Sequence, residues 1–212
     1  DFECTAHTTP ADGDGPTQAA ASWPAAIDIA GAYGIVFRNC VIRNTGESAI
    51  WFHDNTHGSS IVHCYFYDLG ASAVKIGEPT FNAQEATVPY AITVDNNIFH
   101  HCGQEMPCAA GVLLLQARDV SITHNDIGDL YYSGISAGWT WGYNSATQHS
   151  AIADNTIAYN NIHHIGWRQT SDMGGIYTLG EQPRSTIKGN IVHDVLSYDY
   201  GGWGIYTDEG SS

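Results

Sequence analysis

Short segments of alternating apolar and polar residues recur along this chain with a long period. One marker of the repeat is a small residue followed by Ile or Val, which supplies Ile27, Ile50, Val74, Val112, Ile135, Ile176 and Ile205. A second marker is an Asn or Cys with an apolar residue three positions before it and another two positions after it, at Cys40, Cys64, Asn97, Asn125, Asn160 and Asn190. Both markers predict short strands with apolar side chains on one face, separated by turns.

The spacing of the markers predicts the architecture. Successive copies lie at least about 24 residues apart (64 − 40 for the two Cys copies), and longer copies carry their extra residues at the corners between the two markers. A strand pattern with such a period is typical of a parallel β-solenoid, in which each copy forms one coil. We therefore predict an all-β solenoid of about six to seven coils. No stretch keeps a 3.6-residue period long enough to predict a helix.

Equivalent residues of successive coils should stack in columns. In the Asn column, each side chain is expected to hydrogen-bond along the stack and so satisfy polar groups inside the coil. A second column, four residues further on, consists of Asn44, Asp68, His101, Asp129, His164 and Asp194. We interpret it as a structural corner, with a role for His164 in a proton network as the alternative. His101 and His164 are each predicted to lie within hydrogen-bond reach of an Asp of a neighbouring coil.

If the Ile and Val markers point inward, the residues that follow them point outward. The first outward column is Trp51, Lys75, Leu113, Ser136, Tyr177 and Tyr206, and the second ends in Asp208. One flat outer face is therefore expected to carry aromatic rings and, at its C-terminal end, a carboxylate. Long corner insertions beside this face would form a cleft.

We predict one β-helix domain over residues 1–212, with an irregular N-terminal segment over residues 1–25. The repeat begins and ends without a recognisable cap, and open solenoid ends invite further pairing. The ends are therefore expected to be covered by further sequence or by another chain.

Charge excludes some functions. The chain has 7 Lys and Arg against 22 Asp and Glu, a formal net charge of −15. It lacks the basic footprint of a nucleic-acid-binding protein, and it is poor in the cations that would clamp a polyuronate. Neutral sugars remain compatible, and no apolar run is long enough for a membrane span. Among five Cys, Cys102 and Cys108 are the best candidates for a disulfide, and Cys40 and Cys64 are expected to be free.

Two carboxylates are the leading catalytic candidates. Asp172 precedes, and Asp208 follows, the shared sequence Gly-Ile-Tyr-Thr that occurs at residues 175–178 and 204–207. Glycoside hydrolysis typically requires two acidic side chains that face each other across a cleft. Glu209 and Glu181 are the alternatives for either role.

Several neighbouring side chains are candidates for sugar binding, because aromatic rings can stack on pyranose faces and polar groups can bind hydroxyls. They are Trp139, Trp141, His164, Tyr177, Asp199, Trp203 and Tyr206. No cofactor or metal is predicted. His163 and His193 share a repeat position without an evident third ligand, and calcium is left open in so acidic a chain.

The runs at residues 68–74, 132–142, 171–178 and 198–206 resemble right-handed parallel β-helix proteins of the pectate-lyase-like superfold, and in particular glycoside hydrolase family 141. This resemblance implies a secreted or cell-surface enzyme that degrades plant or algal cell-wall glycans. It also implies two catalytic aspartates, which correspond to Asp172 and Asp208. The members of the family are much longer than this chain.

Three functions remain open at this point. The first is a glycoside hydrolase, and the second is a polysaccharide lyase or epimerase, which needs a base and a cation beside a uronate. The third is a solenoid that binds glycan or assembles without catalysis. Clustering of Arg168, Arg184 and Lys188 at the site would favour the second function, and carboxylates that point away from the aromatic face would favour the third.

Overall fold

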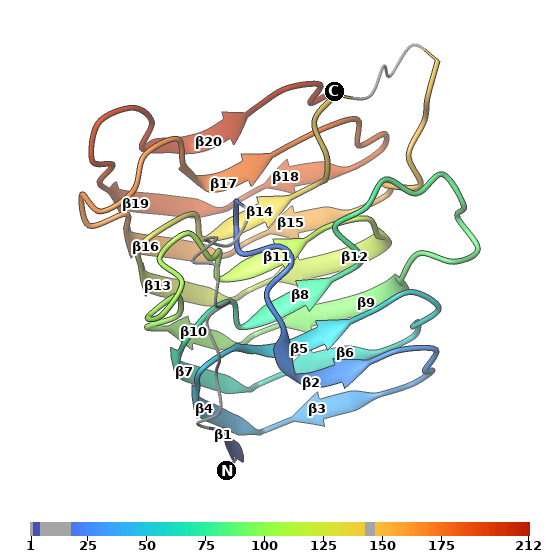
Figure 1. Ribbon diagram of the computed structural model, residues 1–212, viewed down its shortest axis with the longest axis horizontal. Helices are drawn as coiled ribbons and strands as arrows, with labels where there is room; N and C mark the ends of the chain where they lie inside the picture. The colour runs from blue at the N-terminus through green and yellow to red at the C-terminus, as the bar shows by residue number, and fades with distance from the viewer. Residues whose placement is uncertain (1, 5–17, 143–146) are drawn as a thin grey trace, which may run out of the picture.

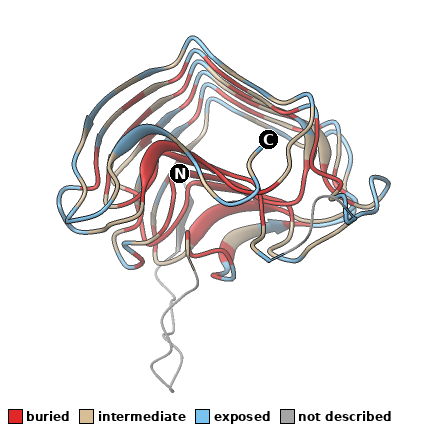
Figure 2. Ribbon diagram, turned by 90° about the horizontal axis from the view of Figure 1, so that it is seen from above, coloured by how far each residue is buried: buried red, intermediate tan, exposed pale blue. Residues whose placement is uncertain are grey.

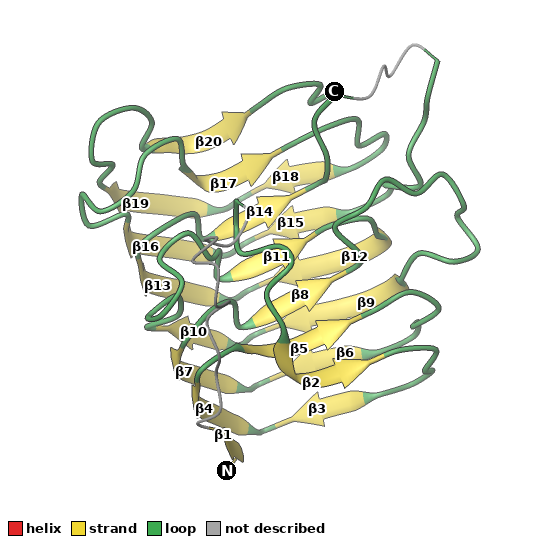
Figure 3. Ribbon diagram, viewed as in Figure 1, coloured by secondary structure: helices red, strands yellow, loops and turns green. Residues whose placement is uncertain are grey.

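The computed structural model describes residues 2–4, 18–142 and 147–212 of the chain. All helices and strands assigned in these residues are β-strands. The described residues contain no helix that could cross a membrane. The strands wind into a rising coil, and each turn adds one strand to each of three parallel sheets (Figures 1 and 3).

The three sheets hold equivalent strands of successive coils. One contains β1 (Phe2–Cys4), β4 (Val41–Thr45), β7 (Tyr65–Leu69), β10 (Ile98–His100), β13 (Asp126–Leu130), β16 (Asn161–Ile165) and β19 (Ile191–Val195). The next contains β2 (Ala25–Ile29), β5 (Ser48–Phe52), β8 (Val74–Ile76), β11 (Val112–Leu114), β14 (Ile135–Ala137), β17 (Gly174–Thr178) and β20 (Trp203–Thr207). The third contains β3 (Val36–Arg38), β6 (Ser60–Val62), β9 (Tyr90–Asp95), β12 (Arg118–Thr123), β15 (Thr156–Ala158) and β18 (Thr186–Lys188).

The register confirms the predicted repeat. In the second sheet, Ile27 pairs with Ile50, Ile50 with Val74, and so on through Ile176 and Ile205. The apolar residues on either side of the Asn column are in register in the same way. The apolar side chains form one buried core cluster. Seen from above, the stacked coils enclose a common interior, and buried residues recur in coil after coil (Figure 2).

The predicted asparagine column forms a continuous ladder. The Nδ2 atoms of Asn97, Asn125 and Asn160 each donate to Oδ1 of the Asn one coil further on, at 2.9 Å. The same Oδ1 atoms accept the backbone N–H of the preceding Asn at 2.9–3.0 Å. The second hydrogen of Asn125 Nδ2 goes to the carbonyl of Val94 at 2.9 Å. Each inner Asn thus uses its amide fully, as a buried polar group must.

The second polar column marks a corner where the backbone turns left-handed. Its residues have φ of 59° at Asn44, 55° at Asp68, 53° at His101 and 51° at His164. Asn, Asp and His tolerate this region better than other side chains, which explains why the column is built from them. His101 and His164 face Asp129 and Asp194 of neighbouring coils, as predicted, but both N–O distances are 3.8 Å, longer than a hydrogen bond.

The outer face of the second sheet is less open than the sequence predicts. Lys75 and Leu113 are fully buried and Trp51 is nearly so. Residues 18–24 contact this face at Lys75. Lys75 Nζ donates to the carbonyl of Trp23 at 2.5 Å and lies 3.3 Å from the ring centroid of Trp51. At the C-terminal end of this column, Tyr206 is half-buried. The rest of the irregular segment predicted over residues 1–25 lies largely outside the described residues.

Two further predictions concern cysteines and the solenoid ends. The disulfide predicted between Cys102 and Cys108 is wrong, because Cys102 is a free, buried thiol, whereas Cys40 and Cys64 are free as expected.

In the last coil, inward-pointing Ile205 is 53% exposed, and a mainly apolar pocket opens beside Thr207. Covering of the ends by further sequence or another chain stays a prediction.

We expect Asn125→Ala to lower the free energy of unfolding by about 2–5 kcal/mol. The substitution leaves the backbone N–H and one Nδ2 hydrogen of Asn97 without an acceptor in the interior, and an unsatisfied buried donor costs about 1–3 kcal/mol. Urea unfolding measures the change. Asn82→Ala is the control, since its amide bonds only within a surface insertion, to Thr87 and Gln84. Equal losses in the two variants would contradict a special role for the ladder.

A second prediction concerns the buried Lys75. Burial lowers its pKa from 10.5 to about 7, although Asp28 and Glu78 partly oppose this shift. Between these two pH values the unfolded chain holds a proton that the folded chain has released. The free energy of unfolding therefore rises with pH there, by up to about 1.4 kcal/mol per pH unit.

Lys75→Met should remove this contribution. Urea unfolding between pH 7 and 9 would then show a shallower rise with pH in Lys75→Met than in the unchanged protein. Lys188→Met, at an exposed Lys, is the control and should keep the original slope. The same slope in Lys75→Met and the unchanged protein would show that Lys75 keeps its proton in the folded state.

Candidate active site

Asp172 is positioned by two corner loops that pair with each other. Its backbone N–H donates to the carbonyl of Tyr200 at 2.6 Å, and the backbone N–H of Tyr198 donates to the carbonyl of Thr170 at 2.7 Å. Gly201 has φ of 102°, and a Cβ there would lie 2.8–3.1 Å from backbone atoms of Met173 and Asp172. A glycine is therefore needed at 201 for the second loop to hold the first.

Asp208 follows directly on β20, on the next coil. Its backbone N–H donates to the carbonyl of Thr178 at 2.9 Å, which continues the ladder between β17 and β20. The side chain is half-buried and turns towards the outer face. There its Oδ2 accepts the hydroxyl of Tyr177 and, at 3.5 Å, the indole N–H of Trp141.

The hydroxyl of Tyr206 lies between the two predicted acids. It is 3.0 Å from Oδ1 of Asp172 and 3.3 Å from Oδ1 of Asp208. The two carboxylate oxygens are therefore no further apart than the sum of these distances. A phenol has one hydrogen and can donate it to only one acceptor at a time. The structure thus brings Asp172 and Asp208 together around one shared hydroxyl.

The surroundings of Asp208 favour its ionised form. Burial raises the pKa of Asp208, but hydrogen bonds from Tyr177, the Glu209 backbone, Trp141 and Tyr206 outweigh burial and hold this pKa below its usual range. Burial also raises the pKa of Tyr206, and its hydrogen bond to Asp172 raises it further. At neutral pH, Asp208 is therefore a carboxylate and Tyr206 keeps its proton.

The aromatic candidates differ in their access to this site. Trp141 is half-buried beside Asp208, whereas Trp139 is 7% exposed and packs within the core cluster, which leaves its ring little contact with solvent. The two indoles meet edge to face at 5.0 Å. Trp203 is 37% exposed, and its ring centroid lies 4.3 Å from that of Tyr206. Trp203 therefore offers an accessible aromatic surface next to the acid pair.

The remaining predicted residues lie at the edge of the site or away from it. Glu209 accepts the backbone N–H of Gly142 at 3.1 Å, and Glu181 faces His149 at 2.9 Å. Asp199 is exposed in the corner loop. The His164 ring lies against His163, His193, Trp167 and Asp194, none of which belongs to the acid pair. The structure therefore gives no support for a proton network through His164 at this site.

Sequence reasoning missed one residue that holds the site together. The hydroxyl of buried Tyr132 donates to the backbone carbonyl of Asp172 at 3.0 Å and accepts the side-chain amide of Gln18 at 2.8 Å. Tyr132 starts one of the runs that carry the family resemblance, which is the signal that could have identified it. Gln18 lies in the N-terminal segment, and no pattern connects it to the site.

Metal binding is possible elsewhere on the protein. Among the residues that the structure describes, one group of three side chains could hold a metal ion, namely His100, Asp126 and His163. It does not include either acid of the candidate active site.

The fold is a right-handed parallel β-helix, and the chain belongs to the right handed beta helix region family, whose model matches residues 25–212. Among solved structures, it is similar to a protein described as a glycoside hydrolase, with 27% identity and a TM-score of 0.75 over 89% of this chain. The alignment covers 33% of that protein, so this chain spans about a third of its length. Comparison with curated protein sequences gives no match.

A second similar structure is the enzymatically active domain of tailspike protein 2 from bacteriophage CBA120. It aligns over 89% of this chain and 26% of its own length, with a TM-score of 0.58 and 9% identity. At that identity the likeness concerns the fold alone.

We expect Tyr177→Phe to raise the pKa of Asp208, because the substitution removes a donor that favours the carboxylate. A ¹³C NMR titration of the Asp carboxyl groups measures this shift. Tyr198→Phe, at a tyrosine that is 75% exposed, should leave the titration unchanged. An unaltered Asp208 titration in Tyr177→Phe would show that the phenol does not stabilise the carboxylate.

Proposed function

We propose that this protein is a glycoside hydrolase that cleaves neutral cell-wall or algal polysaccharides or oligosaccharides with Asp172 and Asp208. The observation that carries the proposal is the Tyr206 hydroxyl, which hydrogen-bonds both carboxyl groups from one position. Two acids that face a common space are the core of most glycosidase sites. The similarity to a glycoside hydrolase structure supports the same reaction class.

The two acids have different roles in this proposal. Asp208 receives several hydrogen bonds that favour its ionised form, so it acts as the nucleophile or base. Asp172 acts as the proton donor to the leaving group. The Tyr206 hydroxyl can donate its one hydrogen to either acid, so it links the two carboxyl groups through a single position.

The separation of the acids favours retention of configuration. Retaining enzymes hold their carboxyl groups about 5–5.5 Å apart, and inverting enzymes about 6.5–9.5 Å apart. The sum of the two distances from the Tyr206 hydroxyl, 3.0 and 3.3 Å, is an upper bound on the separation of the nearest oxygens and falls below the inverting range. Asp208 would therefore form the covalent glycosyl intermediate.

The other side chains suit a neutral sugar. Trp203 and Trp141 border the acids and would stack on sugar rings, and Asp199 would bind hydroxyl groups at the rim. Two of the three cations that would favour a lyase or epimerase are engaged elsewhere: Arg184 forms two bonds to Asp154, at 2.6 and 2.8 Å, and Lys188 lies near Tyr159. Arg168 is exposed in the corner loop that carries Asp172, so the three cations do not cluster at the site.

A purely binding function is less well supported. It would leave the acids pointing away from the aromatic face, whereas both accept hydrogen bonds from the hydroxyls of Tyr177 and Tyr206 on that face. Membership of glycoside hydrolase family 141 and an extracellular location form part of the proposal, because a polymeric glycan is met outside the cell.

Asp172→Asn and Asp208→Asn should each lower the turnover of a cleaved glycan by a factor on the order of 10³ or more. A screen of neutral cell-wall oligosaccharides, read for new reducing ends and for unsaturated products, identifies the substrate and reaction. The first ¹H NMR spectra of the product report its anomeric configuration, which should match that of the substrate.

Glu181→Gln and Glu209→Gln are the matched controls and should keep substantial activity. Full activity in both Asn variants would transfer the catalytic roles to these glutamates. Unsaturated products would replace the hydrolase by a lyase. Glycan binding without any product from the unchanged protein would favour the binding function.

A further inference from the structure

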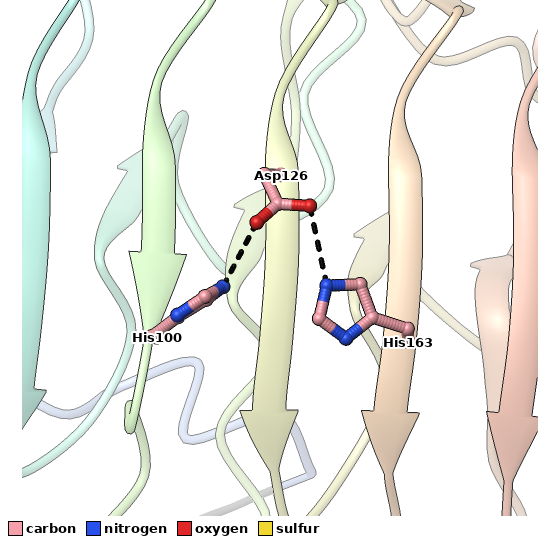
Figure 4. Close-up of side chains that lie close together, drawn as sticks. All are labelled: His100, Asp126 and His163. Carbon is pink, nitrogen blue, oxygen red and sulfur yellow. Dashed lines mark hydrogen bonds and ion pairs between the residues drawn. The ribbon is translucent and has the colours of Figure 1, made fainter.

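A second cluster of reactive side chains lies on a different sheet from the acid pair. His100 ends β10, Asp126 begins β13 and His163 lies within β16, so three consecutive coils each contribute one residue (Figure 4). Nε2 of His100 is 3.1 Å from Oδ2 of Asp126, and Nε2 of His163 is 3.2 Å from Oδ1 of the same carboxylate. The two imidazoles thus converge on Asp126 from opposite sides.

A glycine makes this convergence possible. In the sheet register, His100 pairs with Gly128 and Gly128 pairs with His163, so the glycine occupies the position between the two histidines. A Cβ at Gly128 would lie 2.6 Å from Cε1 and 2.8 Å from Nδ1 of His163. Because the slot is empty, the rings lean together to a centroid distance of 5.7 Å, although their strands are two coils apart.

We propose that His100, Asp126 and His163 bind a divalent transition-metal ion of the zinc class, through the two Nε2 atoms and one carboxylate oxygen. In a tetrahedral zinc site with bonds near 2.0–2.1 Å, neighbouring ligand atoms lie about 3.3 Å apart. Each imidazole nitrogen is close to that distance from one oxygen of Asp126, His100 from Oδ2 and His163 from Oδ1, and one ligand atom from each of the three residues lies within 4.8 Å of the others. Closure around the ion therefore requires the side chains to bring these atoms from separations of at most 4.8 Å to about 3.3 Å.

Neighbouring groups orient two of the ligands. Nδ2 of Asn161, the register partner of Asp126, donates to Oδ1 of Asp126 at 2.8 Å. Nδ1 of His163 lies 2.8 Å from Nδ1 of His164. When His163 Nε2 binds the ion, its Nδ1–H donates to His164, whose other nitrogen faces Asp194 at 3.8 Å. Such outer hydrogen bonds fix the tautomer of a ligating histidine and tune the affinity for the metal.

The ligand set and its exposure identify the kind of ion. Two imidazoles and one carboxylate suit zinc and related ions, whereas calcium and magnesium prefer all-oxygen sites. The side chains of His163, His100 and Asp126 are 16%, 25% and 38% exposed, so the open side of the cluster faces solvent and a water would complete the coordination. The ion would tie β10, β13 and β16 together on the outside of the solenoid.

Titration of the full chain with Zn²⁺ by isothermal calorimetry tests this site. One equivalent should bind to the unchanged protein and raise its thermal midpoint, since an ion that binds only the folded state stabilises it. His100→Ala and His163→Ala should each weaken the binding by on the order of 100-fold or more, and Co²⁺ should give the intense visible bands of tetrahedral coordination in the unchanged protein only. Circular dichroism without metal checks that each variant is folded.

Two further variants separate a built site from weak surface binding. Gly128→Ala keeps all three ligands but fills the slot, and it should lower the Zn²⁺ affinity by about 10-fold or more, as outer-shell changes do. His149→Ala removes an exposed histidine that faces Glu181 at 2.9 Å and should leave the titration unchanged. Absence of Zn²⁺ binding to the unchanged protein, or the same affinity in His100→Ala and His163→Ala as in the unchanged protein, would overturn the proposal and leave a His–Asp–His hydrogen-bonded cluster.

Discussion

The in-register stacking of one coil on the next is the constraint on which the rest of this structure depends. Parallel strands of successive coils lie about 4.8 Å apart, so any residue sits directly against its equivalents in the coils above and below. The asparagine ladder fixes this register from inside, because Asn97, Asn125 and Asn160 each need the next asparagine as acceptor. A slip of one residue would leave these amides unsatisfied in an apolar interior.

Stacking also explains how a site forms from acids that are far apart in sequence. Tyr177 and Tyr206 are register partners on β17 and β20, and their rings meet edge to face at 5.0 Å. Tyr177 on β17 reaches Asp208 at the end of the neighbouring β20, and Tyr206 on β20 reaches Asp172 in the corner loop that precedes β17. The rigid sheet positions Asp208, and paired corner loops position Asp172, so the geometry does not depend on either loop alone.

The proposed metal-binding cluster also arises from the stacking of equivalent residues. It differs in that a glycine interrupts one column of histidines. His100, Gly128, His163 and His193 occupy equivalent positions, and the glycine opens a gap that the flanking rings fill. Where the column is not interrupted, as between His163 and His193, the rings stack at 5.4 Å and 16°. One missing side chain therefore converts a stacked ladder into a converging group of ligands.

The sequence by itself determined the solenoid, its register and its polar columns, because each depends only on residues that recur at one repeat position. It also identified Asp172 and Asp208 as a possible pair through the repeated Gly-Ile-Tyr-Thr. Only the tertiary structure decided what covers each column. Trp23 accepts a hydrogen bond from buried Lys75, Gln18 reaches Tyr132, and the Trp139 ring turns inward while Trp141 borders Asp208. These contacts join segments outside the repeat to segments within it, and no periodicity relates the two. The distance between the acids and the convergence of His100 and His163 on Asp126 likewise depend on side-chain directions, which repeat position alone does not fix.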